Sequence, residues 1–315
     1  MKEHIAIILP AYNEAATIAQ SIESFSRALP DAEIVVINNN SSDRTAEIAG
    51  DTLERLNANG RVLHELRQGK ANAVRRAFLS VNADIYVLVD ADMTYPADCL
   101  QQLIEPVRRD EAEMVVGDRL SGGHYEKENK RGFHQFGNRL VIGLVNLLYG
   151  AKLSDVMSGY RVFSRRFVKN YPILVSGFEL ETDMTLHALD KRFRIVEIPI
   201  EYVDRPEGSV SKLNTFSDGI KVLAIILQIF RHYKPLAFFG FMSVMMALAA
   251  LLVAVPVFDD WIVHRYIYHV PSAVLAAALG LLSAITISLG LVLDSIAYQY
   301  KMRVENKLLA DSEAR

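Results

Sequence analysis

Short apolar runs alternate with longer amphipathic stretches from residue 5 to residue 202. Runs rich in β-branched residues predict buried strands, and apolar positions spaced three and four apart predict helices. The predicted strands are residues 5–9, 34–37, 61–64, 85–89, 114–117 and 195–202. One predicted helix ends at Leu29 and a second ends at about Leu56. The other predicted helices cover about residues 70–81, 98–109, 133–149 and 178–189. Strands that alternate with helices indicate βαβ units, and therefore an α/β fold with a mostly parallel sheet.

Two polar segments interrupt this alternation. Residues 121–131 contain glycines, with five ionic residues between Glu126 and Arg131, and this composition predicts a surface loop. Residues 155–161 predict a turn, and residues 204–209 end the last predicted strand.

The pattern changes after residue 212. Apolar positions recur at helical spacing over residues 213–233, with Lys221, Arg231 and Lys234 among or just after them. This pattern predicts an amphipathic helix in the membrane interface, and a core helix with a basic edge is the alternative. Residues 236–258 and 270–293 carry no charge, and each stretch exceeds the roughly 20 residues that cross a bilayer. Two transmembrane helices are therefore expected, with two buried core helices as the alternative.

Cations flank the two apolar stretches unequally. They cluster at residues 231–234 and 301–307, whereas the loop between the stretches carries only Arg265. The positive-inside rule then places both termini on the cytoplasmic side of the inner (plasma) membrane. We expect a cytoplasmic domain at residues 1–212, a juxtamembrane helix at 213–234, a transmembrane region at 235–298 and a cytoplasmic tail at 299–315, with no cleavable signal at the N-terminus.

Composition narrows the class of protein. The 315 residues carry a net charge of −3, which provides no basic field for nucleic acid. Cys99 is the single cysteine, so an internal disulfide framework is excluded and a reducing compartment fits. The hydrophobic content of 51% is high, and its excess lies after Pro235.

Two carboxylates follow the strand predicted at residues 85–89. Asp90 and Asp92 are one residue apart, at the end of the strand where open α/β sheets bind their ligands. Mg²⁺ and Mn²⁺ prefer oxygen ligands, and Mg²⁺ usually takes one or two carboxylates beside water and substrate phosphates. We interpret the pair as the metal clamp of a nucleotide-dependent enzyme; a capped turn is the alternative.

Polar clusters also follow the first two predicted strands, at residues 10–14 and 38–43. Together with Asp90 and Asp92 they resemble glycosyltransferase family 2, specifically the polyprenyl-phosphate glycosyltransferases similar to dolichyl-phosphate mannose synthase. The resemblance covers about residues 4–234 and continues into a two-helix membrane tail. It implies a GT-A type, Rossmann-like nucleotide-sugar-binding domain. Its motifs are Leu9–Glu14, Asn38–Thr45, Asp90–Asp92, Ser158–Arg161 and Arg205–Lys212.

The resemblance assigns roles to individual residues. Asn39 stands where many relatives have Asp, so base selectivity stays open, and Thr94 stands in place of a Gln that assists the metal in some relatives. Of the two acidic candidates Glu179 and Glu181, one is expected to be a solvated helix position. The implied nucleotide-sugar residues are Pro10, Ala11, Tyr12, Glu14, Asn39, Gly69, Lys70, Asp90, Ala91, Asp92, Arg119, Glu179, Arg205, Ser211 and Lys212; the implied catalytic residues are Asp90, Asp92, Asp155, Arg205 and Lys212, with Asp90 and Asp92 as metal ligands. Arg131 and Arg139 are the candidates for the lipid phosphate, and surface positions are the alternative for them and for Arg119.

The implied acceptor shapes the expected mechanism. A lipid phosphate is already largely an anion at neutral pH, so it needs positioning and charge neutralisation more than a general base. We expect inverting transfer of one hexose or N-acetylhexosamine from a UDP-sugar to a polyprenyl phosphate such as undecaprenyl phosphate, with Mg²⁺ or Mn²⁺. The alternatives are GDP-mannose as donor, a processive polysaccharide synthase, and a non-catalytic membrane scaffold. Related enzymes with two membrane helices form homo-oligomers, including tetramers.

Overall fold

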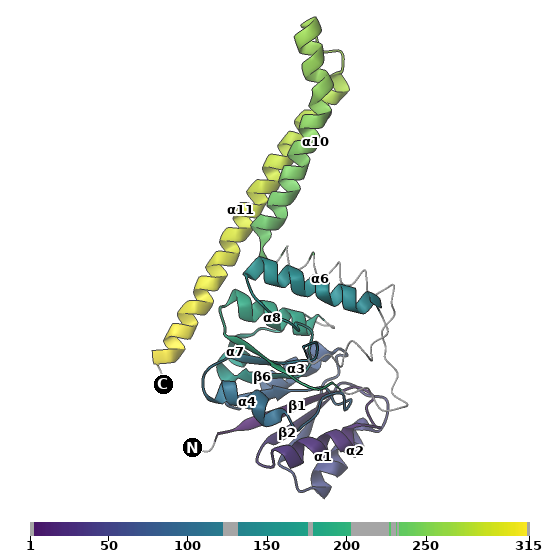
Figure 1. Cartoon of the computed structure of the whole chain (residues 1–315), viewed down its shortest axis with the longest axis vertical. Helices are drawn as coiled ribbons and strands as arrows, with labels where there is room; N and C mark the ends of the chain where they lie inside the picture. The colour runs from purple at the N-terminus through teal and green to yellow at the C-terminus, as the bar shows by residue number, and fades with distance from the viewer. Residues whose placement is uncertain are drawn as a thin grey trace. The chain divides into compact units, whose positions relative to one another are not determined.

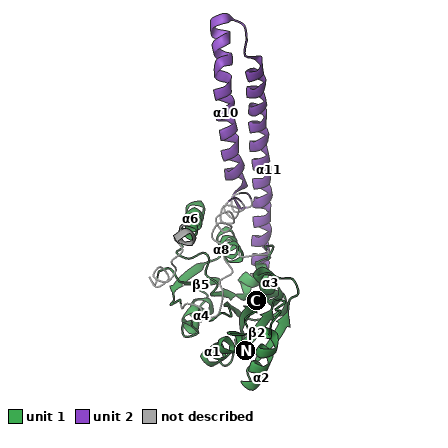
Figure 2. Cartoon of the chain, turned by 90° about the vertical axis from the view of Figure 1, so that its right-hand side faces the viewer, with its two compact units in different colours: residues 1–222 green, residues 223–315 purple. Residues whose placement is uncertain are grey.

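The computed structural model describes residues 3–121, 132–175, 179–202, 227, 231 and 233–313. The chain divides into two compact units, residues 1–222 and residues 223–315 (Figure 2). Most of the predicted loop at 121–131 and most of the predicted interfacial helix at 213–234 lie outside the described residues. We call residues 1–222 the first unit.

The described part of the first unit contains one twisted sheet of seven strands in the order β3-β2-β1-β4-β6-β5-β7 (Figure 1). Neighbouring strands are parallel except at β6, which is antiparallel to both β4 and β5. The mostly parallel sheet predicted from the sequence is therefore confirmed. The strands are β1 Ile5–Ala11, β2 Glu33–Asn38, β3 Gly60–His64, β4 Ile85–Leu88, β5 Met114–Asp118, β6 Arg161–Ser164 and β7 Ile195–Pro199.

The helices of the first unit agree with the predicted stretches to within a few residues, except that the short α7 was not predicted. α1 shows why the pattern was informative: Ile18, Ile22 and Phe25 are its buried apolar residues, spaced four and three apart on one face. The helices are α1 Ile18–Ala28, α2 Thr45–Arg55, α3 Lys70–Ser80, α4 Leu100–Arg108, α6 Gly132–Tyr149, α7 Arg165–Asn170 and α8 Leu180–Asp190.

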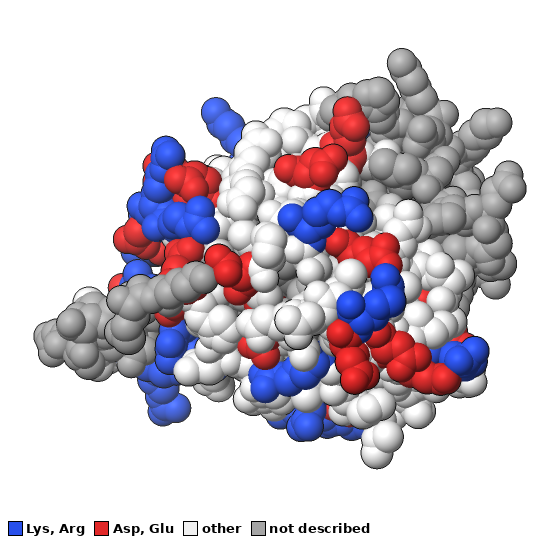
Figure 3. Space-filling view, turned by 90° about the horizontal axis from the view of Figure 1, so that it is seen from below, with Lys and Arg blue, Asp and Glu red and all other residues white. Residues whose placement is uncertain are grey.

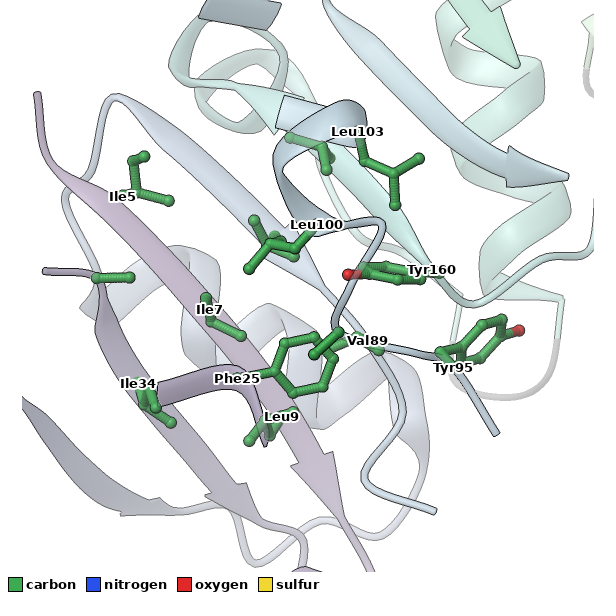
Figure 4. Packing of buried hydrophobic residues seen from close by; sticks show 14 of the residues in the cluster. Ile5, Ile7, Leu9, Phe25, Ile34, Val89, Tyr95, Leu100, Leu103 and Tyr160 are labelled. Carbon is green, nitrogen blue, oxygen red and sulfur yellow. The ribbon is translucent and has the colours of Figure 1, made fainter. Parts of the chain in front are cut away.

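The core that supports the site lies between the sheet, α1 and α4. Figure 4 shows Ile7 and Leu9 of β1 with Phe25 of α1 and Leu100 of α4 around one apolar interior. Tyr160 closes this interior, with its ring edge-on to that of Phe25 at 6.1 Å between centroids. Because this packing immobilises β1 and β4, the loops that follow both strands start from rigid positions.

The sequence analysis missed β6 because its pattern is broken. The strand has four residues, and its first, Arg161, is a charged residue that is fully buried. Val162 and Phe163 are also fully buried, as expected for a strand inside a sheet. The predicted turn at 155–161 therefore leads directly into a central strand.

The second unit contains two long helices, α10 Pro235–His264 and α11 Val270–Glu313, which we call the helical hairpin. Both helices are long and apolar enough to cross a membrane. They run beyond the uncharged stretches at 236–258 and 270–293, and α11 includes most of the segment predicted as a tail. At the turn of the hairpin, the Asp260 carboxylate accepts hydrogen bonds from the backbone N–H groups of Tyr268 and His269 at 2.7 and 2.9 Å.

Candidate active site

The loops after β1 and β2 are joined by side chain to backbone hydrogen bonds. The N–H of Glu14 donates to Thr45 Oγ1 at 2.9 Å, and the N–H of Ala15 donates to Asp43 Oδ2 at 3.1 Å. Burial acts to raise the pKa of Asp43, but the hydrogen bonds from Thr45 and Ala15 outweigh it and lower that pKa. The loop containing the predicted base-pocket residues is thus held against the next loop.

The predicted base-pocket residues themselves come from β1 and its end. Pro10 and Ala11 are the last residues of β1 and lie opposite Ile37 and Asn38 of β2. Tyr12 follows, and its hydroxyl accepts a hydrogen bond from the Gln68 side chain at 3.2 Å. These residues are brought together at the carboxyl edge of the sheet, as predicted.

Asn39 is buried and tied to the loop before α3. Its amide nitrogen donates to the backbone carbonyls of Glu65 and Arg67 at 3.3 and 2.7 Å, and its oxygen accepts from the N–H of Gly69 at 2.8 Å. A carboxylate could accept the last bond but could not donate the other two. An Asp at position 39 would therefore lose two of these three hydrogen bonds.

The strongest charge cluster joins three elements. The Lys70 ammonium, at the first residue of α3, lies 2.5 Å from Asp90 Oδ1 and 2.5 Å from Glu181 Oε1 of α8. Burial acts to lower the pKa of Lys70, but the two carboxylates outweigh it and raise that pKa. A Cβ added at Gly159 would lie 2.5 Å from Asp90 Oδ2 and 3.0 Å from the Lys70 ammonium. The turn before β6 is thus packed closely against this ion pair, and a larger residue there would have to shift the Asp90 and Lys70 side chains.

Asp92 lies one residue further along and is buried. Its Oδ1 accepts from the N–H of Thr94 at 3.2 Å and from the Thr94 hydroxyl at 2.6 Å, while Met93 between them has a φ of 64°. Thr94 is therefore positioned to orient Asp92. This geometry agrees with the capped turn that the sequence left as an alternative, and a capped turn can still present its carboxylate to a ligand.

The donors available for a cation can be tested against these contacts. The described residues contain no group of three or more His, Cys, Asp or Glu side chains able to hold a metal. Asp90 and Asp92 offer oxygen donors, and Mg²⁺ usually takes one or two carboxylates with water and substrate phosphates. The Lys70 ammonium already contacts Asp90, which shows that the position of this carboxylate suits a cation. The donor chemistry fits a divalent cation that shares its ligands with a nucleotide.

Arg119 and Asp155 form a second buried ion pair. Arg119 Nε and a terminal nitrogen donate to the two Asp155 oxygens at 2.8 and 3.0 Å, and the guanidinium lies 5.6 Å from the ring centroid of Tyr202. Burial acts to raise the pKa of Asp155, but Arg119 outweighs it and lowers that pKa. The side chain of Arg119 is only 11% exposed, so the surface position considered from the sequence is wrong.

Other predicted residues are spread more widely. Glu181, rather than Glu179, meets Lys70; it is buried, whereas Glu179 is the half-buried N-cap residue of α8. Arg139 is exposed on α6. Arg131, Arg205, Ser211 and Lys212 lie outside the described residues.

The hydrogen bonds that hold the Ser158–Arg161 motif in place were not predicted from the sequence. Arg161 donates to the carbonyls of Val156 and Ser158, each at 2.8 Å, and the Tyr95 hydroxyl accepts from the N–H of Gly159 at 2.9 Å. The motif itself was the signal, but its buried arginine holds the turn and does not face solvent. On the face in Figure 3, by contrast, charged side chains of both signs are interspersed.

Comparisons with known proteins identify the family of the chain. The profile of glycosyl transferase family 2 matches residues 6–171. The chain is 29% identical over 296 residues to the glycosyltransferase AglJ of Haloferax volcanii, covering 93% of each chain. It is also 29% identical over 235 residues to the undecaprenyl-phosphate mannosyltransferase of Micrococcus luteus, covering 70% of this chain and 91% of the relative.

A solved structure shares the fold. It is glucosyl-3-phosphoglycerate synthase of Mycobacterium tuberculosis, crystallised in complex with Mn²⁺, UDP and phosphoglyceric acid. The TM-score is 0.58 at 20% sequence identity, with 73% of this chain and 78% of that chain covered.

Proposed function

Because the chain belongs to glycosyltransferase family 2, we propose that it transfers one sugar from a nucleotide sugar to a polyprenyl phosphate. It is a glycosyltransferase, and its first unit has the GT-A, Rossmann-like fold. The predicted resemblance to polyprenyl-phosphate glycosyltransferases is confirmed.

The observation that carries the proposal is the charge cluster at the carboxyl edge of the sheet. Lys70, Asp90 and Glu181 meet there, with Asp92 beside them. Ligands of open α/β sheets bind outside this edge, and a nucleotide sugar needs cations near its diphosphate. The cluster supplies both a cationic side chain for the diphosphate and carboxylates for a metal.

In this proposal, Asp90 and Asp92 would hold Mg²⁺ or Mn²⁺, which would supply positive charge to offset that of the departing nucleoside diphosphate. Divalent-metal use is supported by the related fold crystallised with Mn²⁺ and UDP. Thr94 orients Asp92, and Lys70 contacts the donor phosphates. Asp155 positions Arg119 toward the diphosphate or sugar, since a bidentate pair fixes the direction of the guanidinium.

The acceptor phosphate attacks the anomeric carbon on the side opposite the leaving group, so the configuration inverts. The phosphate is already anionic at neutral pH, and the protein therefore has to position it and offset its charge. Arg205, Ser211 and Lys212 are proposed to close over the phosphates, and Arg131 and Arg139 to meet the lipid phosphate. The helical hairpin holds the enzyme at the bilayer, where the insoluble acceptor is found.

The donor is proposed to be a UDP-hexose or UDP-N-acetylhexosamine. UDP in the complex of the related fold supports this base, and the name of the Micrococcus relative favours mannose instead. GDP-mannose is therefore the second candidate donor. Asn39 cannot separate the two, because its amide is occupied by the backbone of the loop before α3.

The test is a donor screen with the full chain in lipid nanodiscs that contain undecaprenyl phosphate. UDP-glucose, UDP-N-acetylglucosamine and GDP-mannose are supplied with Mn²⁺ or with EDTA, and sugar-linked lipid phosphate is measured by mass spectrometry. We expect one donor class to give product, and EDTA to stop it. Absence of a metal-dependent lipid product with every donor would favour the non-catalytic scaffold.

A paired substitution tests the metal assignment. Asp92→Asn keeps an oxygen that can accept the Thr94 hydrogen bonds but removes the charge, so we expect turnover to fall about 100-fold or more while the melting temperature changes little. Asp98→Asn changes an exposed carboxylate nearby and serves as the control. Near-normal turnover of the Asp92 variant would remove Asp92 from the metal site.

The proposed orientation places both termini and the first unit in the cytoplasm of the cell. The protein is also proposed to form homo-oligomers, up to tetramers, as in related enzymes. Tyr266→Cys in the hairpin turn and Ser312→Cys near the C-terminus test the orientation. A membrane-impermeant thiol reagent added to intact cells should label the first and spare the second. Labelling of both from the same side would contradict two membrane crossings.

A further inference from the structure

Lys70 is held between two carboxylates that come from different parts of the fold. Asp90 follows β4, Glu181 lies in the first turn of α8, and the Lys70 ammonium is 2.5 Å from an oxygen of each. The side chain of Lys70 is 18% exposed and that of Glu181 is 9% exposed. An ammonium with two close carboxylates and little water is strongly attached to its position.

The same Asp90 carboxylate is proposed to hold the divalent cation. A metal ion on Asp90 and an ammonium 2.5 Å from its Oδ1 would be close enough to repel each other strongly. On the Oδ2 side the turn at Gly159 leaves little room, because a Cβ added there would be 2.5 Å from that oxygen. Two cations therefore compete for one crowded carboxylate.

The charges of the cluster suggest how the competition is resolved. Asp90, Asp92 and Glu181 carry three negative charges and Lys70 one positive charge, which leaves −2 when no nucleotide is bound. Displacing Lys70 from Asp90 exposes more negative charge to a metal. A diphosphate can draw the ammonium away, since lysine is a point charge on a flexible stem, and Lys70 lies at the N-terminus of α3, where the helix dipole also favours anions.

We propose that Lys70 is a movable counter-cation. Without nucleotide its ammonium binds Asp90 and Glu181, and when the donor binds, the ammonium moves to the donor diphosphate. Nucleotide binding therefore makes Asp90 available to the metal. This inference rests on the proposed nucleotide-sugar site. Glu181 is then a positioning residue that shares the Lys70 ammonium with Asp90, and so weakens the hold of Lys70 on that carboxylate. Metal binds weakly to the empty enzyme and tightly together with the nucleotide.

The test measures Mn²⁺ binding directly. The full chain in nanodiscs is titrated with Mn²⁺ alone and then with Mn²⁺ in the presence of saturating UDP, and free Mn²⁺ is followed by electron paramagnetic resonance. For the wild type, we expect UDP to tighten Mn²⁺ binding by about tenfold or more.

Three variants separate the counter-cation from a merely structural role. Lys70→Met should tighten Mn²⁺ binding without UDP about tenfold and reduce the effect of UDP, because Asp90 is already open. Glu181→Gln should weaken Mn²⁺ binding without UDP, because Lys70 then pairs with Asp90 alone and the cluster loses a negative charge. Lys70→Arg keeps the cation and should keep weak binding without UDP. Lys152→Met, at an exposed lysine, is the matched control.

Opposite shifts for Lys70→Met and Glu181→Gln support the proposal, since a structural defect would weaken Mn²⁺ binding in both. Unchanged or weaker Mn²⁺ binding in Lys70→Met overturns it. If Lys70→Met does not fold, two other results would overturn the proposal. One is that UDP does not tighten Mn²⁺ binding in the wild type, and the other is that Glu181→Gln binds Mn²⁺ more tightly. The proposed function is tested separately. If the wild type transfers sugar to lipid, the proposed function is retained even when the Mn²⁺ measurements contradict the role of Lys70. If the Mn²⁺ affinities shift as expected but no lipid product forms, the role of Lys70 is retained and the proposed acceptor is rejected.

Discussion

The first unit and the helical hairpin differ in how much of their apolar surface they bury. In β1, Ala6, Ile7, Ile8 and Leu9 are completely buried, so apolar groups form the interior. In α10, the buried residues are Pro235, Ser243 and Asp260, while large apolar side chains elsewhere along the hairpin are exposed. The difference fits a first unit that is stabilised by burying apolar side chains away from water, and a hairpin whose exposed apolar surface suits a lipid environment.

The two units should also be stabilised by different interactions. In the first unit, apolar burial gives most of the favourable free energy, and charged groups survive inside by pairing. In the hairpin, lipid is as apolar as the side chains, so close backbone approach and a few hydrogen bonds hold the helices together. Substitutions of the same kind should therefore have different effects in the two units.

The largest difference is expected for truncation of large apolar side chains. Phe163 is fully buried, and its ring centroid lies 4.9 Å from that of Phe167, so Phe163→Ala should lower the free energy of unfolding by about 3–5 kcal/mol. Leu252 is 73% exposed in α10, so Leu252→Ala should change it by less than about 0.5 kcal/mol. Urea titration in detergent micelles, followed by circular dichroism, compares them. Equal losses would contradict the contrast.

In the first unit, a pH effect is expected from His187. His187 is buried beside the rings of Phe167 and Phe193, and burial together with Lys191 lowers its pKa from 6.5 to about 4, although Asp190 opposes this. Between pH 6.5 and 4 the unfolded chain binds the proton before the folded chain does, so stability falls by about 3 kcal/mol as the pH drops.

His187→Phe keeps an aromatic ring and removes the titration. The free energy of unfolding of this variant, measured by urea titration at several pH values, should fall less between pH 6.5 and 4 than that of the wild type. An identical slope in the two proteins would show that His187 contributes nothing to the pH dependence.

Asn39 tests a polar contact inside the first unit. Asn39→Asp removes two donors that face the carbonyls of Glu65 and Arg67, and should cost about 1–3 kcal/mol and weaken UDP binding. Asn59→Asp, at an exposed turn position, is the control. Thermal unfolding and UDP titration by calorimetry measure the two effects. Tighter UDP binding in Asn39→Asp would mean that the side chain contacts the base directly.

A glycine pair tests close helix approach in the hairpin. A Cβ at Gly290 would lie 2.9 Å from the Cβ of Phe239, whereas none of the neighbouring atoms comes within 4 Å at Gly280. Gly290→Val should therefore destabilise the hairpin by about 1–3 kcal/mol, and Gly280→Val by much less. Titration with sodium dodecyl sulfate measures both. Similar losses would show that the helices are not held by this contact.

A smaller effect than at Gly290 is expected at the serine pair of the hairpin. The Ser243 hydroxyl donates to the Ser283 carbonyl and the Ser283 hydroxyl to the Ser243 carbonyl, each at 2.9 Å. A double-mutant cycle with both serines changed to alanine should give a coupling free energy of about 0.6 kcal/mol. A coupling of zero would leave close packing as the main force in the hairpin.

The sequence predicted the elements that depend on local pattern. The apolar runs at 5–9, 34–37 and 85–89 became β1, β2 and β4, because alternation of buried strands and amphipathic helices is visible within a few residues. The carboxylates at 90 and 92 were found for the same reason: they directly follow a buried strand. The two uncharged stretches likewise predicted α10 and α11, although both helices extend beyond the uncharged part.

Tertiary structure alone decided which side chains meet. Glu181 lies far from Lys70 in the sequence, and nothing local distinguishes it from Glu179; only the packing of α8 brings it to the ammonium. Arg161 looked like a turn residue until β6 was inserted between β4 and β5, where its charge is buried. Local periodicity records which face of an element avoids water, whereas the partner of a charge is chosen by how distant elements pack.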